Sequence, residues 1–290
     1  MTAVTDLTWR SDDGLTLYAR DYAPSGGAAR CPVICIHGLT RNSADFEDVA
    51  PWIAAQGRRV IAVDVRGRGR SDRDPHAANY NPAVYAKDIL ALFDQAGIAR
   101  AVFLGTSMGG IITMAVAMKR LKAIAAAVLN DVGPVISMAG LERIRSYVGR
   151  GKPVKTWNDA AEYMKSINEV AFPDYTMAHW LRWARRTFRE DAEHRIVLDY
   201  DPQIAASVQG AKVKSTSLIA KLLYRRLARN RPTLLIRGEK SDIVGAEEAR
   251  YMRRAAPGLI YAEVPGVGHA PMLTEPAAQA ALSSFLANVD

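Results

Sequence analysis

The sequence predicts an α/β protein with a mostly parallel β-sheet that helices cover on both faces. Short apolar runs typical of buried strands, such as Val33 to Ile36 and Val60 to Asp64, alternate with longer segments typical of helices. The middle of the chain, 134–229, breaks this alternation and contains no clear buried strand. The sequence therefore predicts one sheet with a long insertion.

The predicted elements follow one another along the chain. The first is Leu15 to Tyr22, where polar and apolar residues alternate as in a strand. Asn42 is placed to cap a helix that continues to Ala55, and a second helix, from about Pro82 to Ala96, ends at Gly97, where a glycine stop is expected. The other predicted strands and helices are Ala101 to Leu104, Met108 to Lys119, Ala123 to Asn130, Thr233 to Ile236, Leu259 to Val264 and Pro276 to Ala287.

The middle segment is helix-like, basic and rich in aromatic residues. We interpret 134–229 as a helical cap inserted between two strands, so that 1–133 and 230–290 form one core. Between Gly133 and Arg231, 18 lysines and arginines stand against 10 acidic residues, which accounts for the whole net charge of +8. Either the excess lies on solvated helix faces, or it attracts anionic substrates or an acidic surface.

Composition indicates a globular protein without a membrane span. With 49% hydrophobic residues, the 290-residue chain can bury a core without disulfides or metals. Cys31 and Cys35 lie too far apart in one strand to bond each other and are expected as buried thiols. The run Ala123 to Leu129 is too short to cross a bilayer and no signal peptide is evident, so we expect a cytoplasmic location. No nucleic-acid-binding motif accompanies the basic residues.

The segment Gly105-Thr106-Ser107-Met108-Gly109 lies between an apolar strand and a helix. That context predicts a nucleophile elbow, in which a sharp turn holds the serine hydroxyl out from the backbone. The glycines two residues either side of the serine leave the space that so tight a turn requires. Ser107 is therefore the predicted nucleophile.

A serine nucleophile needs a general base, usually histidine, and an acid that orients the base. Of the five histidines, His269 follows the last apolar strand, at the edge where open α/β sheets hold their sites. Asp242 follows the strand before it and is the predicted acid, in the chain order of a known triad arrangement. Asp131, which ends the strand directly after the elbow helix, is the alternative.

A tetrahedral intermediate needs N–H donors for its oxyanion. We expect the backbone N–H of Met108, directly after the nucleophile, and that of Leu39, in the loop after the strand that contains Cys35. His37 is expected to support this loop, and the arginines of 64–72 to connect loops at the sheet edge. No residues show metal-ligand spacing, so neither a metal nor a cofactor is expected.

Together these motifs resemble the α/β-hydrolase family over nearly the whole chain: the His37-Gly38 strand end, the loop 64–72, the elbow, the insertion, and the turns that carry Asp242 and His269. The resemblance implies an eight-stranded sheet flanked by helices, with a helical cap over a pocket above Ser107. It also implies a serine hydrolase that cleaves a small to medium carboxylic ester or lactone through an acyl-enzyme.

Two other functions stay open. The segment Ser107 to Gly110 is similar to the Ser-Met-Gly-Gly of meta-cleavage-product hydrolases, which cleave a carbon–carbon bond. Those enzymes carry tryptophan after the histidine, where this chain has Ala270. The third interpretation is a receptor-like binding protein that keeps the triad.

The expected substrate is a small molecule with a hydrophobic part. Arg41, two residues beyond Leu39, either reaches a substrate carboxylate or lies on the surface at a helix start. Trp180 and Trp183, one helical turn apart, either line the pocket or hold the cap against the core. The sequence gives no indication of the oligomeric state.

Overall fold

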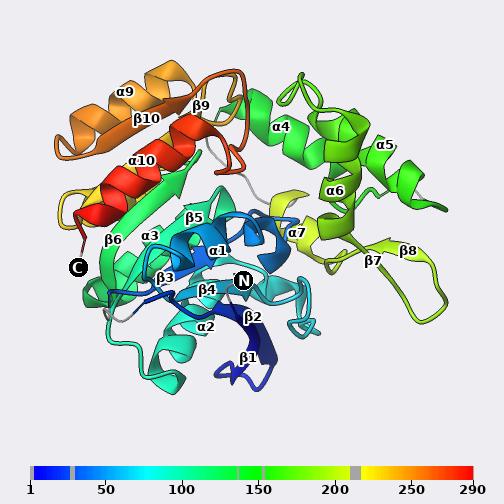
Figure 1. Ribbon diagram of the computed structural model, residues 1–290, viewed down its shortest axis with the longest axis horizontal. Helices are drawn as coiled ribbons and strands as arrows, with labels where there is room; N and C mark the ends of the chain where they lie inside the picture. The colour runs from blue at the N-terminus through cyan, green and yellow to red at the C-terminus, as the bar shows by residue number, and fades with distance from the viewer. Residues whose placement is uncertain (1–2, 27–29, 136, 152–153, 210–216, 290) are drawn as a thin grey trace.

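The computed structural model describes residues 3–26, 30–135, 137–151, 154–209 and 217–289 (Figure 1). At its centre is an eight-stranded sheet with the order β1-β2-β4-β3-β5-β6-β9-β10. The first two strands are antiparallel to their neighbours and the others are parallel, which confirms the predicted sheet. The strands are β1 (Val4–Arg10), β2 (Thr16–Tyr22), β3 (Val33–Ile36), β4 (Val60–Asp64), β5 (Ala101–Thr106), β6 (Ile124–Asn130), β9 (Thr233–Gly238) and β10 (Ile260–Val264).

The central strands are apolar because both of their faces are covered. All residues of β3, β4 and β9 are buried, as expected for parallel strands inside a sheet. Strand β1 was not predicted, because only Trp9 of this edge strand is buried and its polar–apolar alternation is weak. Cys31 and Cys35 are buried free thiols, as predicted.

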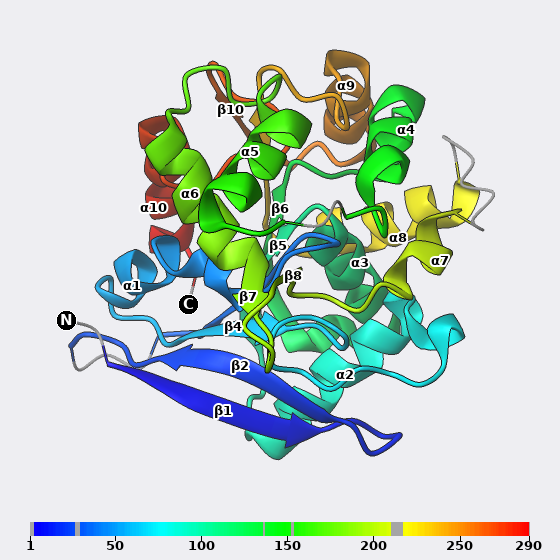
Figure 2. The ribbon, with the colours of Figure 1, turned by 90° about the vertical axis from the view of Figure 1, so that its right-hand side faces the viewer.

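Helices cover the sheet on both faces (Figure 2). One buried cluster joins the sheet to α2, α3, α8 and α9, and a second joins its other face to α1 and α10. In none of the described ranges is a helix both long and apolar enough to cross a membrane. The helices are α1 (Val49–Ala54), α2 (Pro82–Gln95), α3 (Met108–Arg120), α8 (Leu218–Ala228), α9 (Ala246–Ala255) and α10 (Pro276–Ala287), and a short 3-10 helix (Ser43–Phe46) precedes α1.

The insertion lies beside the sheet, at upper right in Figure 1. Its own buried cluster centres on aromatic residues such as Phe172 and Trp180. It comprises α4 (Met138–Tyr147), α5 (Trp157–Asn168), α6 (Met177–Thr187), a hairpin of β7 (Phe188–Glu190) and β8 (Ile196–Leu198), and α7 (Ile204–Gln209).

The predicted cap, 134–229, includes helix α8, but this helix packs against the helices that cover the sheet. Arg226 donates to the Ala117 carbonyl of α3 at 2.9 Å, and the Tyr224 hydroxyl donates to the Met252 carbonyl of α9 at 2.8 Å. Tyr224 is fully buried in the same cluster as α3. We therefore propose that the cap ends before α8.

The cap is joined to the core by backbone and ionic contacts. The Gly69 N–H donates to the Asp199 carbonyl at 3.0 Å, and the Asp201 N–H donates to the Gly67 carbonyl at 2.7 Å. Arg186 of α6 forms ion pairs at 2.7 and 2.6 Å with the two carboxylates that precede α1, Glu47 and Asp48. These contacts fix the cap above the loops that follow β3 and β4.

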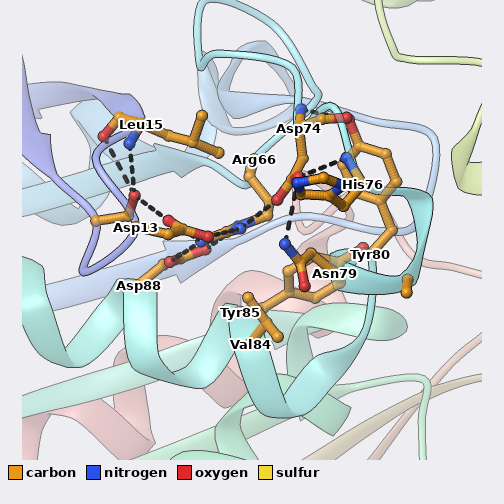
Figure 3. Close-up of polar contacts among 12 residues, drawn as sticks. Asp13, Leu15, Arg66, Asp74, His76, Asn79, Tyr80, Val84, Tyr85 and Asp88 are labelled. Atoms are coloured by element: carbon orange, nitrogen blue, oxygen red, sulfur yellow. Dashed lines mark hydrogen bonds and ion pairs between the residues drawn. The ribbon is translucent and has the colours of Figure 1, made fainter.

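A buried arginine connects three parts of the core (Figure 3). Arg66, 1% exposed, forms ion pairs with Asp13 of the β1–β2 turn, Asp74 of the loop after β4, and Asp88 of α2. Burial raises the pKa of Asp88 to about 6, although its hydrogen bonds to Arg66 act in the opposite direction. The prediction that these loop arginines connect loops is confirmed for Arg66.

Candidate active site

Ser107 occupies the sharp turn between β5 and α3. Its backbone angles are φ 51° and ψ −114°, a left-handed conformation that a residue with a side chain seldom adopts. The flanking glycines allow the turn, because a Cβ atom on Gly109 would collide with the Ile36 carbonyl and one on Gly105 with the backbone of Gly109. The predicted elbow is thus present in the backbone.

His269 lies beside this serine, in the loop that follows β10. Its Nε2 atom is 2.9 Å from Ser107 Oγ, and its side chain is 9% exposed. The neighbouring Gly268 N–H donates to the carbonyl of Ala171, a cap residue, at 2.6 Å. Asn130, at the end of β6, donates to the carbonyl of Pro271 at 2.8 Å. The histidine loop is therefore held from both the cap and the sheet.

The carboxylate in contact with His269 belongs to Asp131 and not to Asp242. Asp131 Oδ2 lies 2.9 Å from His269 Nδ1, and Oδ1 accepts the Gly238 N–H at 3.2 Å. The Asp131 side chain is completely buried. Its φ of 55° turns the chain sharply at the end of β6. The alternative acid of the sequence analysis, and not the predicted one, thus stands beside the histidine.

Asp242 is held by a cap residue instead. Arg143 of α4 binds it through Nε and Nη2, the second contact at 2.9 Å, and the Asp242 side chain is 35% exposed. Burial acts to raise the pKa of Asp242, but the hydrogen bonds and positive charge of Arg143 outweigh it and lower this pKa overall. Helix α4 reaches this loop because Gly140 lies against the backbone of Asp242. The sequence contained no signal for this ion pair.

The loop that carries Leu39 is positioned by His37. The Val65 N–H donates to His37 Nε2 at 3.1 Å, so Nδ1 carries the proton and donates to the Gly38 carbonyl at 2.7 Å. Burial lowers the pKa of His37 to about 3, which keeps the ring neutral. The geometry agrees with the prediction that His37 supports the loop.

Arg68 contacts both residues from which the oxyanion donors are expected. Its Nε donates to the Leu39 carbonyl at 3.0 Å, and its Nη2 lies 3.6 Å from Met108 Sδ. Arg68 is 1% exposed, and neither the Leu39 nor the Met108 N–H bonds another residue within the described ranges. The sequence predicted that Arg68 connects loops but gave no sign of this contact, because Leu39 and Met108 are far from Arg68 in sequence.

A small cavity, about 90 Å³, opens above Ser107 and His269. Arg41 and Trp183 line it, as one interpretation of the sequence expected, and the Arg41 guanidinium lies 4.4 Å from the Trp183 ring centre. Trp180 is not part of the wall. It is 1% exposed and stacks on Trp183 at 5.6 Å, so it belongs to the interior of the cap. In the described part of the chain, no group of three or more His, Cys, Asp or Glu side chains is placed to bind a metal.

Comparison with known proteins gives one consistent result. Residues 32–276 match the family described as alpha/beta hydrolase fold. The 3-hydroxybutyrate-oligomer hydrolase of Cupriavidus necator is 31% identical over 87% of both chains. A crystal structure of an alpha/beta hydrolase from Novosphingobium aromaticivorans is 43% identical over 99% of both chains, with a TM-score of 0.90. The 2-(acetamidomethylene)succinate hydrolase of Mesorhizobium japonicum is 27% identical over 82% of this chain and 81% of its own.

Proposed function

Because the chain belongs to the alpha/beta hydrolase fold family, we propose that it is a serine hydrolase that cleaves a carboxylic ester through an acyl-enzyme on Ser107. One observation carries this proposal. The side chains of Ser107, His269 and Asp131 form a continuous row, with 2.9 Å at both contacts of the imidazole. This is the arrangement that activates a serine hydroxyl.

The row assigns a role to each ring nitrogen of His269. An ionised Asp131 only accepts hydrogen bonds, so Nδ1 carries the proton and Nε2 presents its lone pair to the Ser107 hydroxyl. As Ser107 attacks the ester carbonyl, Nε2 takes the hydroxyl proton and then gives it to the leaving alcohol. Water repeats the sequence on the acyl-enzyme and releases the acid.

The oxyanion would be bound by the N–H groups of Leu39 and Met108. Met108 is the first residue of α3, where the N–H groups at the helix N-terminus favour negative charge. Leu39 lines the cavity, and its carbonyl is held by Arg68. Two fixed donors cost no reorganisation when the charge develops, which is how such sites lower the barrier.

The proposed substrate is an ester of a short hydroxy acid. The relative from Cupriavidus necator, which this chain matches over most of its length, is named for hydrolysis of 3-hydroxybutyrate oligomers. The small cavity fits a short acyl group better than a long acyl chain, and Arg41 adds a polar contact to its wall. These two features support a small polar ester.

The test is steady-state hydrolysis of p-nitrophenyl esters of increasing chain length and of 3-hydroxybutyrate dimers. We expect many turnovers by the wild type and a loss of roughly 10³-fold to 10⁶-fold in kcat for Ser107→Ala. The matched control is Ser283→Ala, an exposed serine of α10, which should match the wild type.

Other outcomes of the same assay would contradict the proposal. One acyl equivalent released without further turnover would favour a receptor-like protein. Cleavage of a carbon–carbon bond in a dienone, with no ester turnover, would favour the meta-cleavage-product hydrolases. Full activity of Ser107→Ala would remove the nucleophile assignment.

A further inference from the structure

Two arginines from different parts of the chain face the cavity of the candidate active site. Arg41 lies in the loop after β3, and Arg143 lies in the cap helix α4. Their side chains are 14% and 26% exposed, so both charges are largely shielded from water. Asp45 is the acidic side chain among the described residues of the wall, and Asp242, just outside it, pairs with Arg143, so one carboxylate stands beside each guanidinium.

Each guanidinium group binds one aspartate through two of its three nitrogen atoms. Arg41 binds Asp45 through Nε and Nη2, and Arg143 binds Asp242 through Nε and Nη2. The Nη1 group of each has no hydrogen-bond partner within the described ranges. A guanidinium has five N–H donors, so each arginine can still bind an anion.

A third donor in the wall also has no partner. Trp183 is 3% exposed, and its Nε1–H has no hydrogen-bond acceptor in the described structure. A buried N–H without an acceptor costs free energy unless a ligand or water supplies one. Because the Arg41 guanidinium lies over the Trp183 ring, a ligand atom at Arg41 is also close to this indole.

The two arginines act on one region of the cavity. Tyr147, which also lines it, interacts electrostatically with both Arg143 and Arg41. Burial raises the pKa of the Tyr147 hydroxyl, and the two positive charges oppose this rise. The lining of the cavity agrees with this, because Arg143 and Tyr147 are one turn apart on α4 and share the wall with Arg41.

This region lies next to the nucleophile. A Cβ atom on Gly38 would be 3.6 Å from Arg41 Cγ and 3.8 Å from Ser107 Cβ. The side chains of Arg41 and Ser107 therefore lie on the same side of this glycine. When an ester carbonyl is bound at Ser107, substrate atoms only a few bonds from that carbonyl therefore lie within reach of Arg41.

We propose that Arg41 and Arg143 bind the free carboxylate of the substrate, which makes the enzyme selective for esters whose alcohol or acyl part carries a carboxylate a few bonds from the scissile carbonyl. This inference rests on the proposed ester hydrolysis and names its substrate class. A carboxylate suits the site because a guanidinium binds its two oxygens in a plane.

The test compares one substrate with and without its charge. The dimer of 3-hydroxybutyrate and the primary amide of that dimer share one scissile ester bond, and neither contains a second ester. We expect wild-type kcat/KM to be at least tenfold higher for the free acid, mainly through KM. In Arg41→Ala and Arg143→Ala this ratio should fall toward one. In Arg185→Ala, an exposed cap arginine that packs on Trp157 away from the cavity, the ratio should match the wild type.

A second measurement needs no variant at all. 3-Hydroxybutyrate should inhibit p-nitrophenyl acetate hydrolysis competitively, whereas its uncharged amide should inhibit at least tenfold more weakly. Equal inhibition by both, or equal kcat/KM for the dimer and its primary amide, would overturn the carboxylate site while ester hydrolysis stands. A wild type that hydrolyses no ester at all would instead overturn the proposed function, and this inference with it.

Discussion

His269 Nδ1 lies 2.9 Å from Oδ2 of Asp131, a carboxylate that is completely buried and whose other oxygen accepts the Gly238 N–H. The bond from Gly238 links two neighbouring strands of the sheet, because Asp131 directly follows β6 and Gly238 ends β9. The Asp131 carboxylate is therefore fixed by the sheet itself. Asp242 lies in the loop beyond β9, where a cap helix binds it.

One pair of substitutions distinguishes the roles of Asp131 and Asp242. Asp131→Asn should lower kcat for p-nitrophenyl acetate by roughly 10³-fold to 10⁴-fold, since an amide favours the wrong tautomer of His269. Asp242→Asn should change it less than about tenfold, because Asp242 contacts Arg143 and not the imidazole. Steady-state kinetics on both variants measures this. The reverse order of effects would restore Asp242 as the acid.

Arg68 should influence turnover although it does not touch Ser107. Arg68→Met removes the donor to the Leu39 carbonyl and the contact with Met108, so one proposed oxyanion donor loses its support. We expect a loss of roughly 10-fold to 100-fold in kcat, with KM nearly unchanged. Arg70→Met, an exposed neighbour that pairs with Asp6, is the matched control.

The Arg68 assay must count active sites, because this buried side chain also supports the fold. We would express kcat per active site, titrated from the acyl-enzyme burst. A normal kcat per titrated site in Arg68→Met, with only fewer sites, would show that Arg68 acts on folding alone.

His37 should make the protein less stable in acid. The pKa of His37 is lowered to about 3 by burial, against about 6.5 in an unfolded chain, so the unfolded state binds the additional proton between these values. The stability that neutral His37 contributes is complete above pH 6.5 and is lost as the pH falls toward 3. At pH 5 the loss is about 2 kcal/mol.

Urea unfolding of the wild type and His37→Gln at pH 7.5 and pH 5 measures this effect. The wild type should lose about 2 kcal/mol more unfolding free energy between the two pH values than the variant, which lacks the titrating ring. An equal loss in both proteins would mean that His37 is protonated in the folded state or does not govern this transition.

Gly109 should be intolerant of any side chain. A Cβ atom there would collide with the Ile36 carbonyl, a backbone atom of a buried strand that cannot move aside. We expect Gly109→Ala to lower the free energy of unfolding by about 3 kcal/mol or more, or to prevent folding. Gly258→Ala, whose added Cβ would meet nothing within 4 Å, should change stability little. Similar thermal midpoints for both variants would refute the steric explanation.

Local patterns were sufficient for the elbow and for most of the sheet. The strand before Ser107, the helix after it and the flanking glycines are neighbours in sequence, so the sequence shows the whole turn. The apolar runs of β3, β4 and β9 stand out because these strands are buried on both faces. Strand β1 escaped prediction since an edge strand with few buried residues has no such pattern.

The sequence by itself indicated that Ser107 and His269 meet at one edge of the sheet, because chain order and strand ends fix their positions. It predicted Asp242 as the acid and kept Asp131 as the alternative, since both follow strands that end at that edge. Tertiary structure decided the choice, because helix α4 brings Arg143 to Asp242 while the turn after β6 directs Asp131 to His269. Which partners meet across distant segments depends on packing, and no local pattern encodes it.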